Sequence, residues 1–166
     1  WSFSPRLSLS YMLTETTTLN ASTGIYHQSP SYIWLAADEG NKNLKQVKVN
    51  QYIAGFEHLL RYDVNLKLEA FFKDYKNYPA SLLRPYLVLA NTGAGFAGAE
   101  DNFAAFGLEP LVSGGKGDVR GIELSLQKKS SDIPHYGIFS LTYSESYFTP
   151  LDGVKRIGSY DQKWIM

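Results

Sequence analysis

The sequence predicts an all-β protein: an antiparallel up-and-down meander of about six to seven strands that forms part of a transmembrane β-barrel wall. Three observations predict this fold. Several segments alternate apolar and polar residues with period two, as strands with two unlike faces do. Their connections are alternately short and long, which places the long loops at one end of the sheet, as is typical of membrane barrels. No stretch between the segments has the pattern of a confident helix.

The first pair of predicted strands covers Arg6–Leu13 and Leu19–Gln28, joined by Thr14–Thr18. The apolar residues that share one face of these two strands are Leu7, Leu9, Tyr11 and Leu13, then Leu19, Ala21 and Ile25. Polar and small residues occupy the positions between them. The connection is short enough for a hairpin, so we expect the two strands to pair directly.

The second pair covers Val47–Leu60 and Val64–Lys73, joined by Arg61–Asp63. The later strand alternates clearly, with Val64, Leu66, Leu68, Ala70 and Phe72 on one face. The earlier strand is irregular: Val47, Val49 and Ile53 alternate with Lys48, Asn50 and Tyr52, and the phase blurs beyond Gly55. An extra residue would reset the alternation, so we expect a β-bulge near Gly55.

The third pair covers Val119–Lys128 and Gly137–Phe148, joined by Lys129–Tyr136. The apolar face is predicted to carry Ile122, Leu124 and Leu126, then Phe139, Leu141 and Tyr143. A seventh strand is expected to begin within Asp161–Met166.

Three long connections remain, Ser29–Gln46, Asp74–Asp118 and Thr149–Tyr160. Within the second, Tyr86–Ala90 is compatible with a short strand and Glu100–Phe106 with a short helix. Gly93–Gly98 matches the dinucleotide fingerprint G-x-G-x-x-G, but that motif needs a βαβ unit in a parallel sheet. The flanking segments form hairpins, so we interpret this stretch as a flexible or tightly turned loop.

Composition excludes several classes of protein. Lys+Arg and Asp+Glu both number 16, so the sequence offers no electrostatic reason to expect a nucleic-acid partner. No apolar run approaches the roughly 18 residues that a membrane-spanning helix needs. Cysteine is absent, which argues against a disulfide scaffold. The chain starts at Trp1, and Ser2–Ser10 lacks the regions of a signal peptide, so we expect residues 1–166 to be one segment of a longer protein.

Alternation alone leaves two architectures open. In a soluble β-sandwich the apolar face of each strand is the core, whereas in a membrane barrel it meets lipid and the polar face lines the lumen. Placement of the long loops at one end favours the barrel. The alternative is a soluble ligand- or carbohydrate-binding module, with Trp34 and Tyr86 as stacking platforms.

The sequence shows no constellation for catalysis. His27, His58 and His135 lack a metal-ligand spacing, and no G-x-S-x-G elbow is present. We therefore predict a protein that is not an enzyme, with no catalytic residue, no metal and no cofactor.

Candidate ligand contacts lie in the long loops. Tyr32 and Trp34 fall in the first loop, and Arg84 and Tyr86 in the second. Aromatic and charged side chains on loops commonly contact ligands. The competing interpretation is that Tyr32 and Trp34 pack onto the base of their own loop.

Six blocks of sequence, in chain order, carry a family resemblance. They are Ser4–Tyr11 (SPRLSLSY), Leu19–Pro30 (LNASTGIYHQSP), Gln51–Glu57 (QYIAGFE), Leu66–Tyr78 (LKLEAFFKDYKNY), Arg120–Leu124 (RGIEL) and Ser159–Lys163 (SYDQK). Together they resemble the barrel of TonB-dependent outer-membrane receptors. Lys163-Trp164 departs from the basic–His pair that usually closes the last block.

The resemblance implies a large barrel in the bacterial outer membrane, of which this chain is a part. It implies energy-coupled uptake of a scarce ligand of the siderophore, cobalamin or carbohydrate class. The implied partners are that small-molecule ligand, outer-membrane lipid, and a plug domain with an energy-coupling protein that act through a more N-terminal part. A wall segment on its own would have open edges and a bare apolar face, so we expect the isolated chain to self-associate.

Overall fold

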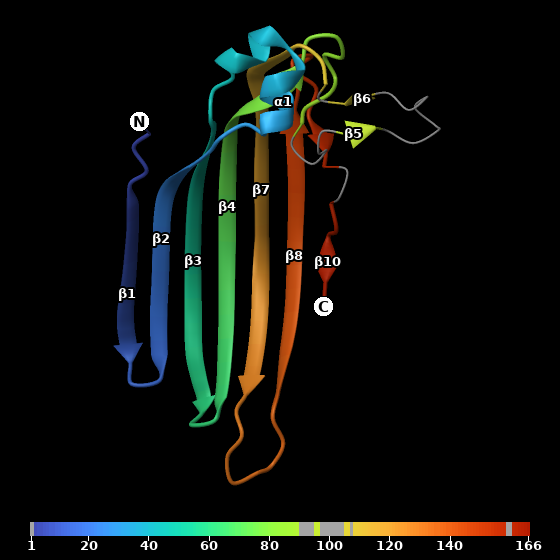
Figure 1. Cartoon of the computed structure of the whole chain (residues 1–166). Coiled ribbons are helices and arrows are strands. Elements are labelled where there is room, and N and C mark those ends of the chain that lie inside the picture. The colour runs from blue at the N-terminus through green and yellow to red at the C-terminus, as the bar shows by residue number, and fades with distance from the viewer. Residues whose placement is uncertain (1, 90–94, 97–104, 107, 159–160) are drawn as a thin grey trace.

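The computed structural model describes residues 2–89, 95–96, 105–106, 108–158 and 161–166. One antiparallel sheet dominates it, with strands in the order β1-β2-β3-β4-β7-β8-β10 and β9 paired with β8 (Figure 1). The β1–β2 and β3–β4 turns and the longer connection from β7 to β8 lie at one end of this sheet, and the helices lie at the other. The predicted all-β meander is confirmed.

The long strands of the sheet are β1 (Arg6–Thr14), β2 (Thr17–Gln28), β3 (Val47–Arg61), β4 (Val64–Ser81), β7 (Leu111–Lys128) and β8 (Gly137–Thr149). The short elements are helix α1 (Tyr32–Ala37), the 3-10 helix η1 (Glu39–Asn43), and strands β5 (Gly95–Phe96), β6 (Ala105–Phe106), β9 (Arg156–Ile157) and β10 (Trp164–Ile165). Strand β10 pairs with β8, which confirms the strand expected within Asp161–Met166. Among the described residues, no helix has the length and apolar character needed to cross a membrane.

Strands β4 and β7 are longer than predicted. They pair with each other from Val64↔Lys128 as far as Ser81↔Leu111, so the strands extend into residues 74–81 and 111–118, which were predicted to be part of a connection. Gly117, which falls in that predicted connection, is needed inside the strand. A Cβ atom at Gly117 would lie 2.7 Å from Cδ1 of Phe148, whose ring occupies that space.

The irregularity of β3 lies elsewhere than predicted. Its register with β4 runs without a break through Gly55, and the shift falls between Leu59 and Arg61, so the bulge expected near Gly55 is wrong. The apparent blur arose because Ile53 lies on the polar face. Tyr52 and Phe56 lie on the apolar face with Phe72 and Leu68, their register partners.

Three expectations about the connections change. The loop Ser29–Gln46 contains α1 and η1, although no helix was expected there. Tyr86–Ala90 is not a strand: Val88 makes an isolated bridge to Ala80, and Ala90 lies outside the described residues. Ala105 and Phe106 form β6 rather than the end of a helix, while residues 100–104 lie outside the described part. Of Gly93–Gly98, only Gly95 and Phe96 are described, and they form β5.

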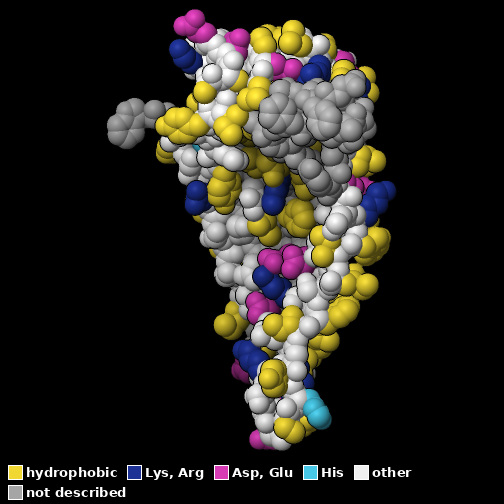
Figure 2. All heavy atoms as spheres, turned by 45° about the vertical axis from the view of Figure 1, so that its right-hand side comes forward, with side chains coloured by type: hydrophobic (Ala, Val, Ile, Leu, Met, Phe, Trp, Pro, Cys, Tyr) yellow, Lys and Arg dark blue, Asp and Glu magenta, His cyan; other side chains and the backbone are white. Residues whose placement is uncertain are grey.

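The two faces of the sheet differ in chemistry. On the apolar face, side chains from neighbouring strands stand in rows and remain exposed; Tyr52 is 51% exposed and Ile122 is 51% exposed. The opposite, polar face carries the ion pair between Lys67 Nζ and Glu69 Oε2 at 2.7 Å. Figure 2 shows hydrophobic side chains along the right-hand margin and charged ones nearer the middle of that view. No layer covers the apolar face among the described residues.

The buried apolar side chains gather at the loop end of the sheet. They are Val47, Ala80, Leu89, Leu111 and Phe148. There the connection after β4 packs on the sheet, since a Cβ atom at Gly115 would lie 2.5 Å from Cγ2 of Val88. The buried apolar side chains therefore hold the connections against the loop end of the sheet, and they do not lie over its middle.

Candidate functional site at the loop end

Two connections build the loop end of the sheet. Helices α1 and η1 join β2 to β3 and carry Tyr32 and Trp34, and the connection from β4 to β7 carries Arg84 and Tyr86. Both connections lie at the same end of the sheet (Figure 1). The four predicted contact residues therefore come from loops that lie next to each other.

Asn41 joins the two connections. Its side chain is fully buried, and Nδ2 donates hydrogen bonds to the main-chain oxygens of Trp34 at 2.8 Å and Glu109 at 2.9 Å. Its Oδ1 accepts a hydrogen bond from the Leu111 amide at 2.7 Å. One side chain thus satisfies three backbone groups in two loops, and a buried amide is stable only when it is bonded in this way.

An ion pair holds the second loop. Arg84 Nη1 lies 3.4 Å from Glu109 Oε2, and the Glu109 side chain is only 5% exposed. The Arg84 amide also donates to Ser81 Oγ at 2.9 Å. Glu109 therefore compensates the charge of Arg84 within the protein.

The aromatic candidates differ in exposure. Tyr32 is 89% exposed and Tyr86 is 57% exposed. Trp34 is half-buried, and its indole Nε1 is buried with no hydrogen-bond partner among the described residues. The structure brings Trp34 and Arg84 into one bonded network through Asn41 and Glu109, whereas the rings of Tyr32 and Tyr86 face solvent.

Sequence reasoning missed Asn41 and Glu109. Asn41 stands in the polar run Glu39–Asn43, which looks like an ordinary solvated loop. Only its burial against a segment 68 residues away reveals its role. No local sequence signal could have identified it.

The loop end exposes aromatic side chains. Exposed aromatic rings offer faces for stacking on sugar or other planar groups. No group of three or more His, Asp or Glu side chains able to hold a metal ion occurs within the described residues. The described His27 and His58 bond to hydroxyls of Ser4 and Thr17 at 3.0 Å and 2.9 Å.

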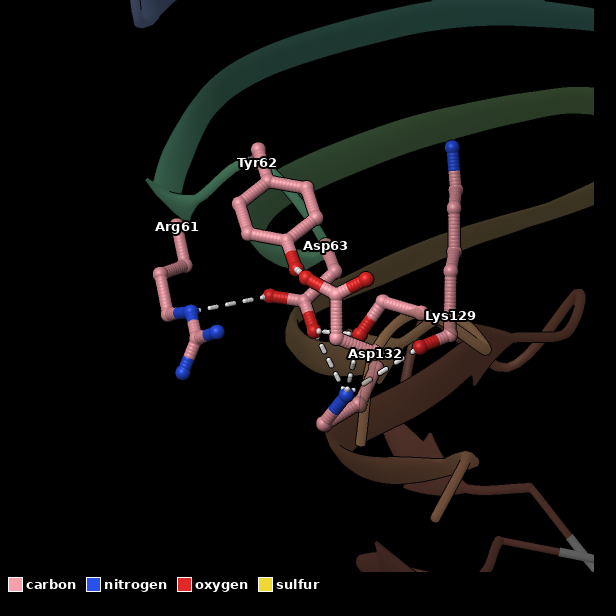
Figure 3. Close-up of polar contacts among 7 residues, drawn as sticks. Arg61, Tyr62, Asp63, Lys129 and Asp132 are labelled. Carbon is pink, nitrogen blue, oxygen red and sulfur yellow. Dashed lines mark hydrogen bonds and ion pairs between the residues drawn. The ribbon is translucent and has the colours of Figure 1, made fainter. Parts of the chain in front are cut away.

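A charged cluster around Asp63 lies at the opposite end of the sheet, at the turns (Figure 3). Asp63 Oδ2 accepts hydrogen bonds from Lys128 Nζ and Ser131 Oγ, both at 2.6 Å, and Arg61 Nε lies 3.2 Å from Oδ1. The hydrogen bond from Lys128, followed by that from Ser131, lowers the pKa of Asp63 from 3.8 to about 2. The Lys129 amide donates to the Asp63 main-chain oxygen at 2.8 Å. The cluster therefore joins the β3–β4 turn to the β7–β8 turn.

Comparison with known proteins agrees with this architecture. The family model described as "TonB dependent receptor-like, beta-barrel" matches residues 1–164. A search of curated proteins finds no match to the chain.

Proposed function

Because the chain belongs to the TonB-dependent receptor-like β-barrel family, we propose that it forms part of the wall of a receptor for energy-coupled uptake of a scarce ligand. The ligand classes proposed are siderophores, cobalamins and carbohydrates. The family comprises receptors and transporters of the outer membrane, and it is not an enzyme family.

The observation that carries this proposal is the uncovered apolar face. Large side chains on it stay exposed, including Leu9 at 67%, Tyr52 at 51% and Phe139 at 50%. Exposed contiguous apolar surface of this kind marks contact with a membrane or another protein. A soluble sandwich would need a second sheet over this face. The only other sheet among the described residues consists of β5 and β6, which have two residues each.

Open edges support a larger barrel. Among the described residues, strand β1 pairs on one side only, with β2, and at the other margin of the sheet β10 pairs only with β8. An open edge within a membrane would leave backbone groups unsatisfied, so a barrel wall needs further strands on both sides. We therefore propose that residues 1–166 are one segment of the barrel, and that the rest of the receptor supplies the remaining strands, the plug and the contact with the energy-coupling protein.

The loop end is the proposed ligand-facing side, because long loops of outer-membrane barrels are extracellular. Tyr32, Trp34, Arg84 and Tyr86 are the proposed contacts. Exposed rings of Tyr32 and Tyr86 can stack on a sugar, a catechol or a corrin ring, all of which have flat or apolar faces. Arg84 stays among the proposed contacts as a charged residue whose position is set by its ion pair with Glu109.

Uptake by cells that make the intact receptor tests the proposal. The probes are ferric enterobactin, cyanocobalamin and maltoheptaose, each radiolabelled, with and without a protonophore. We expect one probe to accumulate only when the receptor is present and to stop accumulating when the protonophore removes the energy supply. Equal accumulation in cells that lack the receptor, for all three probes, would overturn the proposal.

A further inference from the structure

Three lysines form a row across the loop-end part of the sheet. Lys48 of β3 is the register partner of Lys76 of β4, and Lys76 is the register partner of Lys116 of β7. Register partners have Cα atoms about 4.5–5.5 Å apart and side chains on the same face of the sheet. The register between Lys48 and Tyr52 is unbroken, so the row lies on the apolar face.

This row is poorly compensated by the protein itself. Like charges directly opposite each other on neighbouring strands are destabilising. Lys76 Nζ lies 3.4 Å from Asp74 Oδ2, but the nearby carboxylate of Asp118 is engaged by Lys155 at 2.7 Å. Within the described part of the chain, Lys48 and Lys116 form no ion pair. The row therefore keeps a net positive charge that an external anion would neutralise.

The height of the row places it next to the membrane boundary. Below it on the same face come Asn50, Asp74 and Asp118, then Tyr52 and Phe72, whose rings stack with centroids 6.4 Å apart. Four residues of strand span about 14 Å, or about 10 Å of height at the usual tilt of barrel strands. Aromatic rings mark the interface of a barrel with the headgroups, so the ammonium groups lie at headgroup depth on the loop side.

A shallow groove lies farther down the same face, beginning at the stacked rings of Tyr52 and Phe72. Ala54 and Ala70 are register partners on β3 and β4, and Ala21 of β2 is the partner of Ala54. Their small side chains leave a groove of about 540 Å³ with Leu7, Tyr52 and Phe72 on its walls. Its lining is apolar, so it suits an acyl chain and not a second polar group.

We propose that the lysine row Lys48–Lys76–Lys116 binds the phosphate groups of a phosphorylated glycolipid of the lipid A type in the outer leaflet. One acyl chain of this lipid lies in the alanine groove beneath the row. The two features act independently. The charge of the lysine row binds the headgroup, and the groove above the small alanine side chains holds the acyl chain. The inference rests on the proposed function in two respects, that this face meets lipid and that the loop end faces outward, and it does not depend on which ligand the receptor transports.

Lipid titration of the purified intact receptor tests the inference. Native mass spectrometry would compare diphosphoryl lipid A, dephosphorylated lipid A and phosphatidylglycerol. The row variant is Lys48→Gln/Lys76→Gln/Lys116→Gln. The control variant is Lys42→Gln/Lys45→Gln/Lys129→Gln, which removes the same charge from the loops and the opposite turn.

We expect the row variant to bind diphosphoryl lipid A at least tenfold more weakly than the wild type, while the control variant is unchanged. Dephosphorylated lipid A should bind the wild type as weakly as lipid A binds the row variant. Separately, Ala54→Phe fills the groove and should weaken lipid A binding without changing the charge. Lys116→Gln alone gives a second test if the triple variant fails to fold.

Three results would overturn the inference. The first is equal lipid A affinity in the row and control variants. The second is equal binding of phosphatidylglycerol and lipid A, which would mean attraction to any anionic lipid. The third is full displacement of lipid A by inorganic phosphate at equal concentration, which would identify a site for a free anion.

Discussion

Asn41 and Glu109 are bonded across 68 residues of sequence, with Asn41 Nδ2 donating to the Glu109 main-chain oxygen at 2.9 Å. Replacing Asn41 by Ala removes that bond and leaves the Leu111 amide buried and unsatisfied. Each unsatisfied buried group costs about 1–3 kcal/mol. We expect amide exchange at Leu111 to accelerate at least tenfold in Asn41→Ala, measured by hydrogen exchange on the intact receptor.

The matched control is Asn43→Ala, since Asn43 lies in the same 3-10 helix but is exposed. Exchange at Leu111 should be unchanged in that variant. Equal acceleration in both variants would mean that Asn41 has no special role in joining the loops.

The aromatic side chains at the loop end give a second prediction. Tyr86→Ala should weaken binding of the transported probe roughly tenfold, because loss of a stacking ring costs about 0.5–1.5 kcal/mol beyond lost contact area. Isothermal titration of the intact receptor measures the change. Tyr136→Ala is the control, because Tyr136 is 78% exposed but lies in the turn at the opposite end. Equal affinities for the two variants would exclude Tyr86 as a ligand contact.

The Asp63 cluster predicts a dependence on pH at the turn end. The folded-state pKa of Asp63 is lowered from 3.8 to about 2, so its stabilising effect is present above pH 3.8 and is lost as pH falls toward 2. Hydrogen exchange at the Lys129 amide, corrected for its intrinsic rate, should show increasing opening between pH 4 and pH 2. In Asp63→Asn this pH dependence should disappear.

Asp132→Asn serves as the control for that experiment, since Asp132 is exposed and, within the described ranges, its carboxylate accepts a hydrogen bond only from the hydroxyl of Tyr62, at 2.8 Å. It should keep the wild-type pH profile. A flat profile in the wild type would contradict the role assigned to Asp63.

Close packing on the polar face makes Gly121 sensitive to substitution. A Cβ atom there would lie 2.5 Å from Cζ of Phe71 and 2.5 Å from the main-chain oxygen of Tyr143. Gly121→Ala should therefore lower the stability of the intact receptor by about 1–3 kcal/mol, as overpacking typically does. Urea unfolding measures this loss. Gly137→Ala is the control, because nothing lies within 4 Å of its Cβ position, and a similar loss there would contradict the steric explanation.

The bare apolar face predicts the behaviour of the isolated chain. In detergent-free buffer we expect self-association, since large apolar side chains such as Leu7, at 69% exposure, have no cover. Light scattering should show oligomers that a detergent disperses. A monomer in plain buffer with no binding of a hydrophobic dye would contradict a lipid-facing surface.

Much of the sheet could be predicted from the chain alone. Alternation within a single strand places Leu66, Leu68 and Phe72 on one face whatever the neighbours are, and short connections pair β1 with β2 and β3 with β4. Among the candidate contacts, Tyr32 and Tyr86 were identified by residue type and loop position. Their role in binding stays a prediction.

Other features depend on contacts between distant segments. Strand β7 continues through its glycines as far as Leu111 because it pairs there with β4 and because the ring of Phe148 occupies the space beside Gly117. No local sequence pattern indicates those neighbours. The sequence around Asn41 is typical of an exposed loop, whereas in the fold Asn41 is buried and bonded to the main chain of Glu109. The three lysines of the row are far apart in sequence, and the register of β3, β4 and β7 places them side by side. Periodicity is a property of one strand, whereas register, burial and close packing are properties of the assembled sheet, and so only the tertiary structure could decide them.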